Sequence, residues 1–249
     1  MSSSGTCGSE TCRVFLELVF PIIGTILLTA VEFAPLPVVI EVEKTKKLRF
    51  NPLPYATNLA NCLAWSLYGL LIKDYFVYAP NLTGTFLCLY YVMATYGFAT
   101  DNQQLWMKIF AVGGTALLWL VSYICFIPLK DISAGSTTLG LLATLYFCAF
   151  VASPLSNILH VIRTRDSSSI HFGLSATIVV SSICWVCYGA AIQDMFITVS
   201  NAIGSLSGIL QLFCLWAYPT KVVKDEKGGG DAEEHAVDVV VEQEDESKL

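Results

Sequence analysis

Seven long apolar stretches, separated by short polar breaks, dominate the hydrophobicity pattern of the chain. Each is close to the ~20 residues that an α-helix needs to cross the hydrocarbon core of a bilayer. The stretches lie at 14–40, 52–73, 75–98, 103–127, 137–162, 169–192 and 195–218. The breaks are as short as TDNQ at 100–103 and RTRDSS at 163–168. The pattern predicts an all-α membrane protein with seven transmembrane helices.

Part of this pattern occurs twice. WSLYGLLIKDYFVYAPNLTGTF begins at Trp65, and WVCYGAAIQDMFITVSNAIGSL begins 120 residues later at Trp185. The two align without a gap, and the identical pairs are Trp65/Trp185, Tyr68/Tyr188, Gly69/Gly189, Ile72/Ile192, Asp74/Asp194, Phe76/Phe196, Asn81/Asn201 and Gly84/Gly204. Two related halves that face each other in a membrane are typical of transporters with a central site.

The repeat predicts a 3+1+3 arrangement of the helices. We expect a first three-helix repeat at 14–98, a linker helix at 103–127 and a second three-helix repeat at 137–218. An odd linker helix gives both repeats the same orientation. The result is two parallel three-helix bundles related by an axis along the membrane normal.

Composition agrees with a membrane protein, at 55% hydrophobic residues and a mean hydropathy of +0.62. The net charge of −6 resides in the tail at 219–249, where ten acidic residues oppose four lysines. The remaining chain is neutral overall, so no nucleic-acid partner is expected. The acidic tail cannot bury enough apolar surface to fold, which predicts a disordered cytosolic segment.

Basic residues gather on one side of the predicted bundle. That side holds Lys44, Lys46, Lys47, Arg49, Lys108, Arg163, Arg165, Lys221 and Lys224, whereas the other holds Arg13, Lys73 and Lys130. The positive-inside rule makes the first side cytosolic. The tail at 1–13 is then extracytosolic and the C-terminus cytosolic. Without an evident sorting signal the plasma membrane is the default, and a vacuolar or other internal membrane is the alternative.

Prolines interrupt the predicted helices at related places. Pro35 and Pro154 lie 119 residues apart at matching depths of the first and fifth spans. A proline inside a helix removes one backbone hydrogen bond and kinks the helix. Pro54 opens the second span, where proline is also a common start signal, and His171 takes the corresponding place in the sixth span.

Two pairs of side chains within the spans suit a polyhydroxylated ligand. Asn81 and Asn201 place amides in the membrane, where such groups face protein or water. Trp65 and Trp185 lie mid-span, away from the interface where membrane tryptophans act as anchors. Amides that hydrogen-bond hydroxyl groups, beside flat apolar rings, predict a central sugar pocket.

The outer ends of the repeated stretch carry Tyr68, Tyr188, Asp74 and Asp194. Phenols that donate to carboxylates would close a gate there. For the two aspartates, a pair of solvated loop residues is the alternative.

Glu32 is an intramembrane carboxylate, three residues before Pro35. Such a group is a functional hypothesis by default. Three interpretations stay open: it couples transport to a proton, it pairs with a base, or it lines a wet cavity.

The nine cysteines predict no metal site. Seven lie in apolar spans, where cysteine serves as a small hydrophobe. Cys184 and Cys187 form a C-x-x-C without a second pair or a nearby histidine, so neither metal nor cofactor is expected. Cys7 and Cys12 in the N-terminal tail are either a disulfide or two free thiols. The sequence shows no pair of a nucleophile and a base, so an enzyme is not expected.

Two segments carry a resemblance to a known family. PYATNLANCLAWSLYG at 54–69 and ASPLSNILHVIRTRDSSSIHFGLSATIVVSSICWVCYG at 152–189 resemble the two repeat motifs of the SWEET sugar transporters, the MtN3/saliva family. The resemblance extends over about residues 14 to 218. It implies a passive sugar uniporter that works by alternating access in the lipid bilayer and assembles into homo-oligomers.

The resemblance also implies roles for individual residues. The pocket would comprise Asn81, Asn201, Trp65, Trp185, Asn61, Ser181, Val31 and Phe150. The extracellular gate would comprise Tyr68, Tyr188 and Asp194. The proline hinge would comprise Pro35, Pro54 and Pro154, with His171 in the fourth position. His171 and Glu32 both depart from the family pattern.

Pocket size bears on the choice of sugar. Asn61 and bulky Phe150 favour a hexose such as glucose, whereas Val31 and Ser181 fit a disaccharide equally well. We therefore expect a monosaccharide rather than a disaccharide.

Two other classes of protein compete with a sugar uniporter. A seven-helix receptor lacks a three-plus-three repeat and needs longer cytosolic loops. A related transporter of another small solute, such as an amino acid or an organic acid, would share a Pro-Gln dipeptide that this chain lacks. Proton coupling through Glu32 is a variant of the transporter hypothesis.

Overall fold

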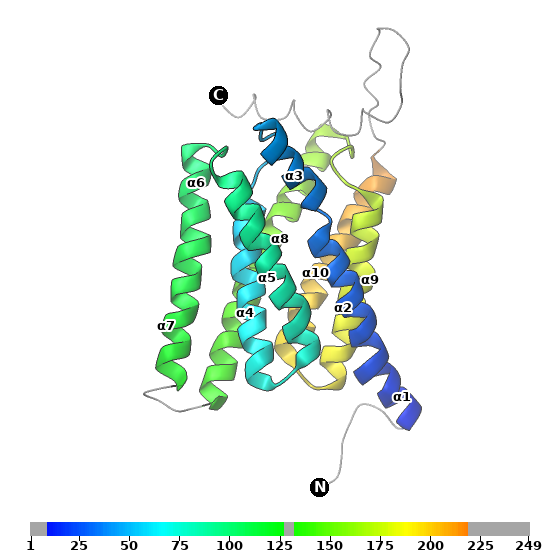
Figure 1. Cartoon of the computed structure of the whole chain (residues 1–249). Coiled ribbons are helices and arrows are strands. Elements are labelled where there is room, and N and C mark those ends of the chain that lie inside the picture. Colours follow the sequence, from blue (N-terminus) through cyan, green and yellow to red (C-terminus); the bar gives the residue numbers. More distant parts are fainter. Residues whose placement is uncertain (1–8, 127–131, 219–249) are drawn as a thin grey trace.

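Helices account for almost all of the described chain (Figure 1). The computed structural model describes residues 9–126 and 132–218, and no strand occurs among them. The predicted acidic tail at 219–249, Cys7 and Lys130 lie outside the described residues. Cys12 is disulfide-bonded. The predicted all-α fold class is confirmed.

The helices follow the predicted order. The first repeat contains α1 (Glu10–Val14), the π-helical segment η1 (Phe15–Val19), α2 (Phe20–Phe33), α3 (Leu36–Thr45), α4 (Leu53–Ile72) and α5 (Tyr75–Tyr96). The linker contains α6 (Asp101–Lys108), the π-helical segment η2 (Ile109–Gly114) and α7 (Thr115–Phe126). The second repeat contains α8 (Ile132–Thr164), α9 (Phe172–Ala191) and α10 (Met195–Ala217).

Five helical segments of the described chain are long and apolar enough to cross a membrane. They are Glu10–Thr45, Asp101–Cys125, Ser133–Thr164, Phe172–Ala191 and Met195–Ala217. The helices α4 and α5 are also long enough, at 20 and 22 residues, but they carry more polar side chains. Because α4 is enclosed by α5, α8 and the linker, it can hold amides that a lipid-facing helix cannot.

The two matching prolines have different local effects. Pro35 separates α2 from α3, and the break is closed by a turn in which Ala34 N–H donates to the Val31 carbonyl at 3.2 Å. Helix α8 runs through Pro154 without interruption. The helix is therefore broken at Pro35 in the first repeat and continuous through Pro154 in the second.

Helix α8 begins at Ile132, five residues before the predicted start of the span. Its first turns are rich in serine and threonine, which lowered their hydrophobicity in the sequence pattern. Ser136 donates its hydroxyl to the Ser133 carbonyl at 3.0 Å, and Thr138 donates to the Ala134 carbonyl at 2.7 Å. These hydroxyls return their hydrogen bonds to the helix, so polar residues join it.

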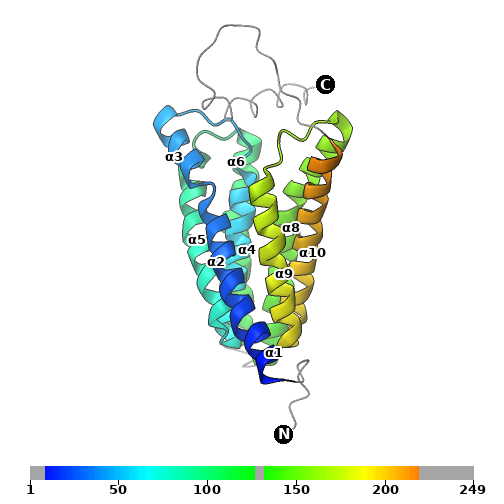
Figure 2. The same cartoon turned by 90° about the vertical axis from the view of Figure 1, so that its right-hand side faces the viewer.

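Helices of the two repeats pack against one another (Figure 2). Within each repeat the last two helices form a hairpin, α4 with α5 and α9 with α10. Between repeats, α2 packs against α9 and α4 packs against α8. The first helix of each repeat therefore lies on the second helix of the other, and the linker covers α4 and α8.

Both hairpins turn in the same way. Lys73 and Gln193 adopt the left-handed conformation, each with φ of 59°. The following Asp74 and Asp194 donate their N–H groups to the carbonyls of Gly69 and Gly189, both at 2.8 Å. Their carboxylates then cap α5 and α10. The repeated Gly and Asp positions therefore have a shared structural cause.

We expect Gly69→Ala to destabilise the protein by about 1–3 kcal/mol through overpacking. A Cβ at this position would lie 2.8 Å from the Tyr78 backbone nitrogen, which cannot move independently of α5. Thermal unfolding in detergent measures the loss. Gly97→Ala is the matched control because no atom lies within 4 Å of a Cβ there. Equal melting temperatures for both variants would contradict the prediction.

Candidate functional site

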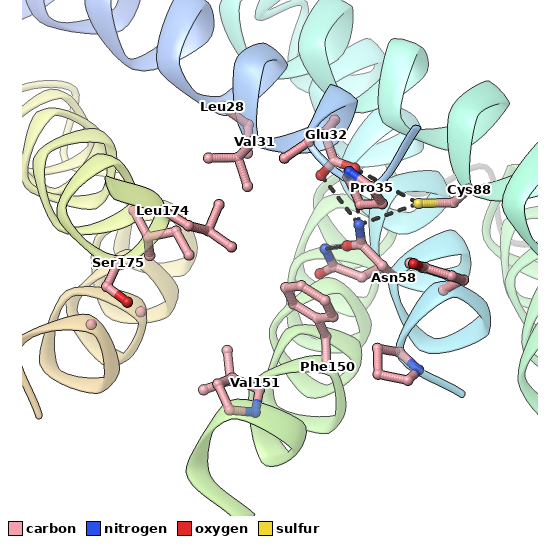
Figure 3. A pocket seen from close by; sticks show the side chains of 18 of the residues that line it. Leu28, Val31, Glu32, Pro35, Asn58, Cys88, Phe150, Val151, Leu174 and Ser175 are labelled. Atoms are coloured by element: carbon pink, nitrogen blue, oxygen red, sulfur yellow. Dashed lines mark hydrogen bonds between the residues drawn. The ribbon is translucent and has the colours of Figure 1, made fainter. Parts of the chain in front are cut away.

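A cavity of about 980 Å³ lies between the two repeats. It is bordered by α2, α3, α4 and α5 from the first repeat and by α8, α9 and α10 from the second (Figure 3). From the level of Trp65 and Trp185 it extends to the end of the bundle that carries exposed Lys47 and Arg49.

Every residue predicted for the sugar pocket or the hinge lines this one cavity. These residues are Val31, Asn61, Trp65, Asn81, Phe150, Ser181, Trp185, Asn201, Pro35, Pro54, Pro154 and His171. In Figure 3 the ring of Phe150 projects from α8 into the cavity, with Val31 on α2 above it. The fold thus brings together side chains that are up to 170 residues apart in the sequence, as between Val31 and Asn201.

The paired asparagines are held in the same way in both repeats. Asn81 Nδ2 donates to the Val77 carbonyl at 2.8 Å, and Asn201 Nδ2 donates to the Ile197 carbonyl at 2.9 Å. Each bond lies within its own helix and fixes the amide against it. The side-chain carbonyls, which make no hydrogen bond to another described residue, remain to accept from a ligand.

The paired tryptophans form the inner wall of the cavity. Trp65 and Trp185 are 6% and 4% exposed and belong to the largest buried cluster of the bundle. Gly24 allows the second indole to approach α2, because a Cβ there would lie 2.9 Å from Trp185 Nε1. This buried Nε1 has no hydrogen-bond partner among the described residues.

The third matched pair breaks the symmetry of the pocket. Asn61 Nδ2 donates to Asn58 Oδ1 at 3.2 Å, whereas the buried Asn61 Oδ1 has no partner in the described chain. Ser181, its counterpart, donates its hydroxyl to the Gly24 carbonyl at 3.2 Å. Buried polar atoms usually have partners. Asn61 Oδ1 and Trp185 Nε1 belong to residues that line the cavity, but both atoms are shielded from solvent in this conformation.

The opposite end of the bundle is closed by two crossed hydrogen bonds. Tyr68 donates its hydroxyl to Asp194 at 2.6 Å, and Tyr188 donates to Asp74 at 2.6 Å. Each bond joins one repeat to the other. Both tyrosine rings are buried, so this end is closed by side chains of both halves.

Aromatic contacts also join the two repeats at this end. The rings of Tyr68 and Phe196 pack edge to face with their centroids 5.8 Å apart, and those of Tyr188 and Phe76 do so at 6.1 Å. The sequence analysis named Asp74 as a possible gate residue, although the gate implied by the family resemblance left it out. It gave no role to Phe76 or Phe196, which occupy identical positions of the repeat, so the signal was present.

Glu32 lies in the wall of the cavity and is only 7% exposed. Asn58 Nδ2 donates to both of its carboxylate oxygens, at 3.2 Å and 3.0 Å. The thiols of Cys62 and Cys88 donate to it at 3.7 Å each. None of these partners is basic, so within the described residues Glu32 does not pair with a base. Cys62 and Cys88 are buried in the core as expected, and they also belong to this polar network.

The hinge positions lie toward the open end of the cavity. His171 is the N-cap residue of α9, with extended backbone at φ of −96° and no capping bond from its side chain. Pro54 occupies the first turn of α4. The two aligned positions therefore both lie at helix starts, where a proline is tolerated.

A family model described as sugar efflux transporters for intercellular exchange matches residues 18–104 and 137–222. The matched segments cover more than half of the chain and include both repeats. The chain belongs to the SWEET family. This membership and the helices that span a membrane identify an integral membrane protein of a sugar-transporter family.

Individual relatives agree with this assignment. The bidirectional sugar transporter SWEET5 of Arabidopsis thaliana is 29% identical over 201 residues, which cover 79% of this chain and 84% of the relative. The sugar transporter SWEET1 of Drosophila pseudoobscura pseudoobscura is 30% identical over 169 residues, which cover 68% and 74%. The relatives span plants and animals, so SWEET-type sequence is shared across distant organisms.

A solved eukaryotic SWEET transporter has the same fold. It superposes with a TM-score of 0.73 at 24% sequence identity, covering 83% of this chain and 98% of that chain. The predicted 3+1+3 arrangement of two parallel bundles is therefore confirmed.

Proposed function

We propose that this SWEET protein carries sugars passively across its membrane by alternating access, with a preference for monosaccharides. The paired amides and indoles that line the cavity support this proposal most directly. Asn81 and Asn201 keep their side-chain carbonyls to accept hydrogen bonds, and Trp65 and Trp185 form the inner wall. A sugar hydroxyl can donate to such a carbonyl while an apolar face of the sugar stacks on tryptophan.

The closed and open ends support the transport cycle. The crossed Tyr–Asp bonds close one end, and the other end is open beside basic side chains. By the positive-inside rule the open end is cytosolic and the N-terminal side is outside. We assign the eight pocket residues to sugar binding, Tyr68, Tyr188 and Asp194 to the outer gate, and the prolines with His171 to the hinge.

Flux measurements in liposomes test the proposal. The purified protein is expected to equilibrate labelled glucose across the membrane without any ion gradient, and to carry sucrose more slowly. Empty liposomes are the control for leakage. Flux that requires an ion gradient would contradict passive transport. Faster sucrose flux would contradict the monosaccharide preference, which rests on Asn61 and the intruding ring of Phe150.

Residence and assembly complete the proposal. We place the protein in the plasma membrane as a homo-oligomer. Each copy contains a whole cavity between its own two repeats, so each carries its own transport path. Nothing in this scheme requires a catalytic step.

We expect His171→Pro to leave the fold intact and to change the rate of glucose flux by more than about twofold. Within the described residues the backbone N–H of His171 makes no hydrogen bond that a proline would remove. Proline would fix φ near −65° and stiffen the residue before the helix. Flux at saturating glucose measures the effect, and His171→Ala separates the backbone effect from the loss of the imidazole. Unchanged kinetics would show that this position is not a hinge.

Proton coupling through Glu32 is the second candidate mechanism. It rests on a buried carboxylate that lines the cavity and lacks a basic partner among the described residues. If Glu32 binds the coupled proton, Glu32→Gln should abolish any dependence of flux on pH between about 4 and 7, because glutamine does not titrate and still offers one oxygen to accept from Asn58 Nδ2. Flux in symmetric buffers of varied pH measures this. Identical pH profiles for parent and variant would remove Glu32 from the mechanism.

A further inference from the structure

Glu32, Cys62 and Cys88 bring three metal-ligating groups together inside the first repeat. One ligand atom from each lies within 4.8 Å of the other two, and all three residues are buried. They come from α2, α4 and α5, and their positions 32, 62 and 88 share no close spacing in the sequence. The fold alone creates this group, which is why the cysteine spacing predicted no metal site.

The distances suit a small thiophilic cation. Glu32 Oε1 lies 3.7 Å from Cys62 Sγ, and Glu32 Oε2 lies 3.7 Å from Cys88 Sγ. Tetrahedral zinc, with bonds of about 2.3 Å to sulfur and about 2.0–2.2 Å to oxygen, separates its sulfur and oxygen ligands by roughly 3.5 Å. Both observed sulfur–oxygen distances lie within a few tenths of an ångström of this value.

Asn58 completes the group (Figure 3). Its Nδ2 donates to both carboxylate oxygens and to Cys88 Sγ, the last at 3.3 Å. The amino group therefore contacts the same atoms that a bound cation would contact. Rotation of the terminal amide would instead direct Oδ1 there as a fourth ligand. We propose that Glu32, Cys62, Cys88 and Asn58 form a binding site for a thiophilic divalent cation, with zinc as the natural occupant.

Space, access and charge agree with this site. Gly84 provides the space, because a Cβ there would lie 2.8 Å from Cys62 Sγ and 3.1 Å from Glu32 Cδ. Glu32, Asn58 and Cys88 line the cavity, which gives the ion a route from solvent. Binding of the cation displaces one proton from each thiol to water. Replacement of two thiol protons by one divalent cation leaves the net charge of the site unchanged, at −1 with the Glu32 carboxylate.

A hydrogen bond links the proposed metal site to the sugar pocket. Asn61 Nδ2 now donates to Asn58 Oδ1. When the Asn58 amide rotates toward the metal, its amino group faces Asn61, which must rotate as well to accept. Asn61 then presents an amino group where its free oxygen lay. Metal binding thereby exchanges an acceptor for a donor in the pocket. This consequence rests on the proposed sugar function, whereas metal binding itself does not.

Cobalt(II) absorption tests the binding directly. The full-length protein in detergent, kept without oxygen and without reductant so that the disulfide at Cys12 persists, is titrated with cobalt(II) as a spectroscopic substitute for zinc. We expect one equivalent to produce thiolate-to-cobalt charge-transfer absorption, and zinc to displace it. Cys62→Ser/Cys88→Ser should remove this absorption, and Glu32→Gln should weaken the affinity at least tenfold.

Cys184→Ser/Cys187→Ser is the matched control, because it removes the other closely spaced pair of free thiols. This variant should bind cobalt like the parent. Thermal unfolding checks that every variant is folded. Absence of charge-transfer absorption in the parent would overturn the site, as would its persistence in folded Cys62→Ser/Cys88→Ser.

Glucose flux with and without zinc then tests the link to the pocket. We expect zinc to slow flux in the parent and in the Cys184→Ser/Cys187→Ser control, but not in Cys62→Ser/Cys88→Ser. Cobalt binding without any glucose flux would retain the metal site and overturn the proposed function. Flux unaffected by zinc in a protein that binds cobalt would overturn only the coupling through Asn61.

Discussion

Replacing Asn201 with alanine should reduce glucose flux about tenfold or more while the protein stays folded, and Asn81→Ala should act similarly. Each amide is fixed by a bond from Nδ2 to its own helix and keeps its carbonyl oxygen for the cavity. Removing it leaves a bound sugar hydroxyl without a partner, at a cost of about 1–3 kcal/mol. Each 1.4 kcal/mol corresponds to about a factor of ten in affinity.

Glucose flux and glucose-dependent quenching of tryptophan fluorescence measure the two consequences separately. Binding should weaken together with flux, since Trp65 and Trp185 lie in the same pocket. Thr83→Ala is the matched control. It removes a polar group from α5 whose hydroxyl bonds to the Ala79 carbonyl and which does not line the cavity. An Asn201→Ala protein with parental flux and affinity would exclude this amide from the sugar site.

The repeat in the sequence carried most of the information about the cavity. Trp65, Trp185, Asn81 and Asn201 were predicted as one pocket because identical residues at related positions come together when two halves face each other. In the structure all four line one cavity. Polarity and periodicity suffice for this inference, because a polar side chain within a span faces the protein interior or a water-filled cavity.

Prediction was weaker wherever the two halves differ. Pro35 breaks its helix and Pro154 does not, although both occupy matching places in the sequence. Asn58 went unnoticed because its partner in the other repeat is not an amide, and its contacts to Glu32 and Cys88 bridge 26 and 30 residues. Such contacts depend on how three helices rotate about their axes, and a broad apolar stripe in the sequence does not specify this rotation closely.

Removing both gate hydroxyls should open the end of the bundle that is now closed. In Tyr68→Phe/Tyr188→Phe the two rings keep their packing, but neither crossed bond to Asp194 and Asp74 can form. Each bond to a carboxylate contributes about 1.5–3 kcal/mol when shielded from water. We expect the population open at this end to rise by at least about tenfold, which requires only 1.4 kcal/mol.

The distance between the two hairpin turns measures this opening. Tyr75 and Met195 follow Asp74 and Asp194 and are 73% and 67% exposed, so cysteines there accept spin labels without disturbing the gate. The accessible thiols of Cys148 and Cys187 are first replaced with serine. The double phenylalanine variant should show a longer distance that the parent lacks. Tyr123→Phe, the same change on an exposed linker tyrosine, should not.

A double-mutant cycle separates the gate from the turn that supports it. Asp194 also caps α10 by accepting from the Ile197 N–H at 3.0 Å, so Asp194→Ala would damage the helix and the gate together. Asn is an equally good cap, and Asp194→Asn therefore weakens only the bond to Tyr68. Combined with Tyr68→Phe it should add little further opening, because both changes remove the same bond. Additive effects would show that Tyr68 and Asp194 act independently. Asp194→Asn with Tyr188→Phe should be additive, because these residues belong to different crossed bonds.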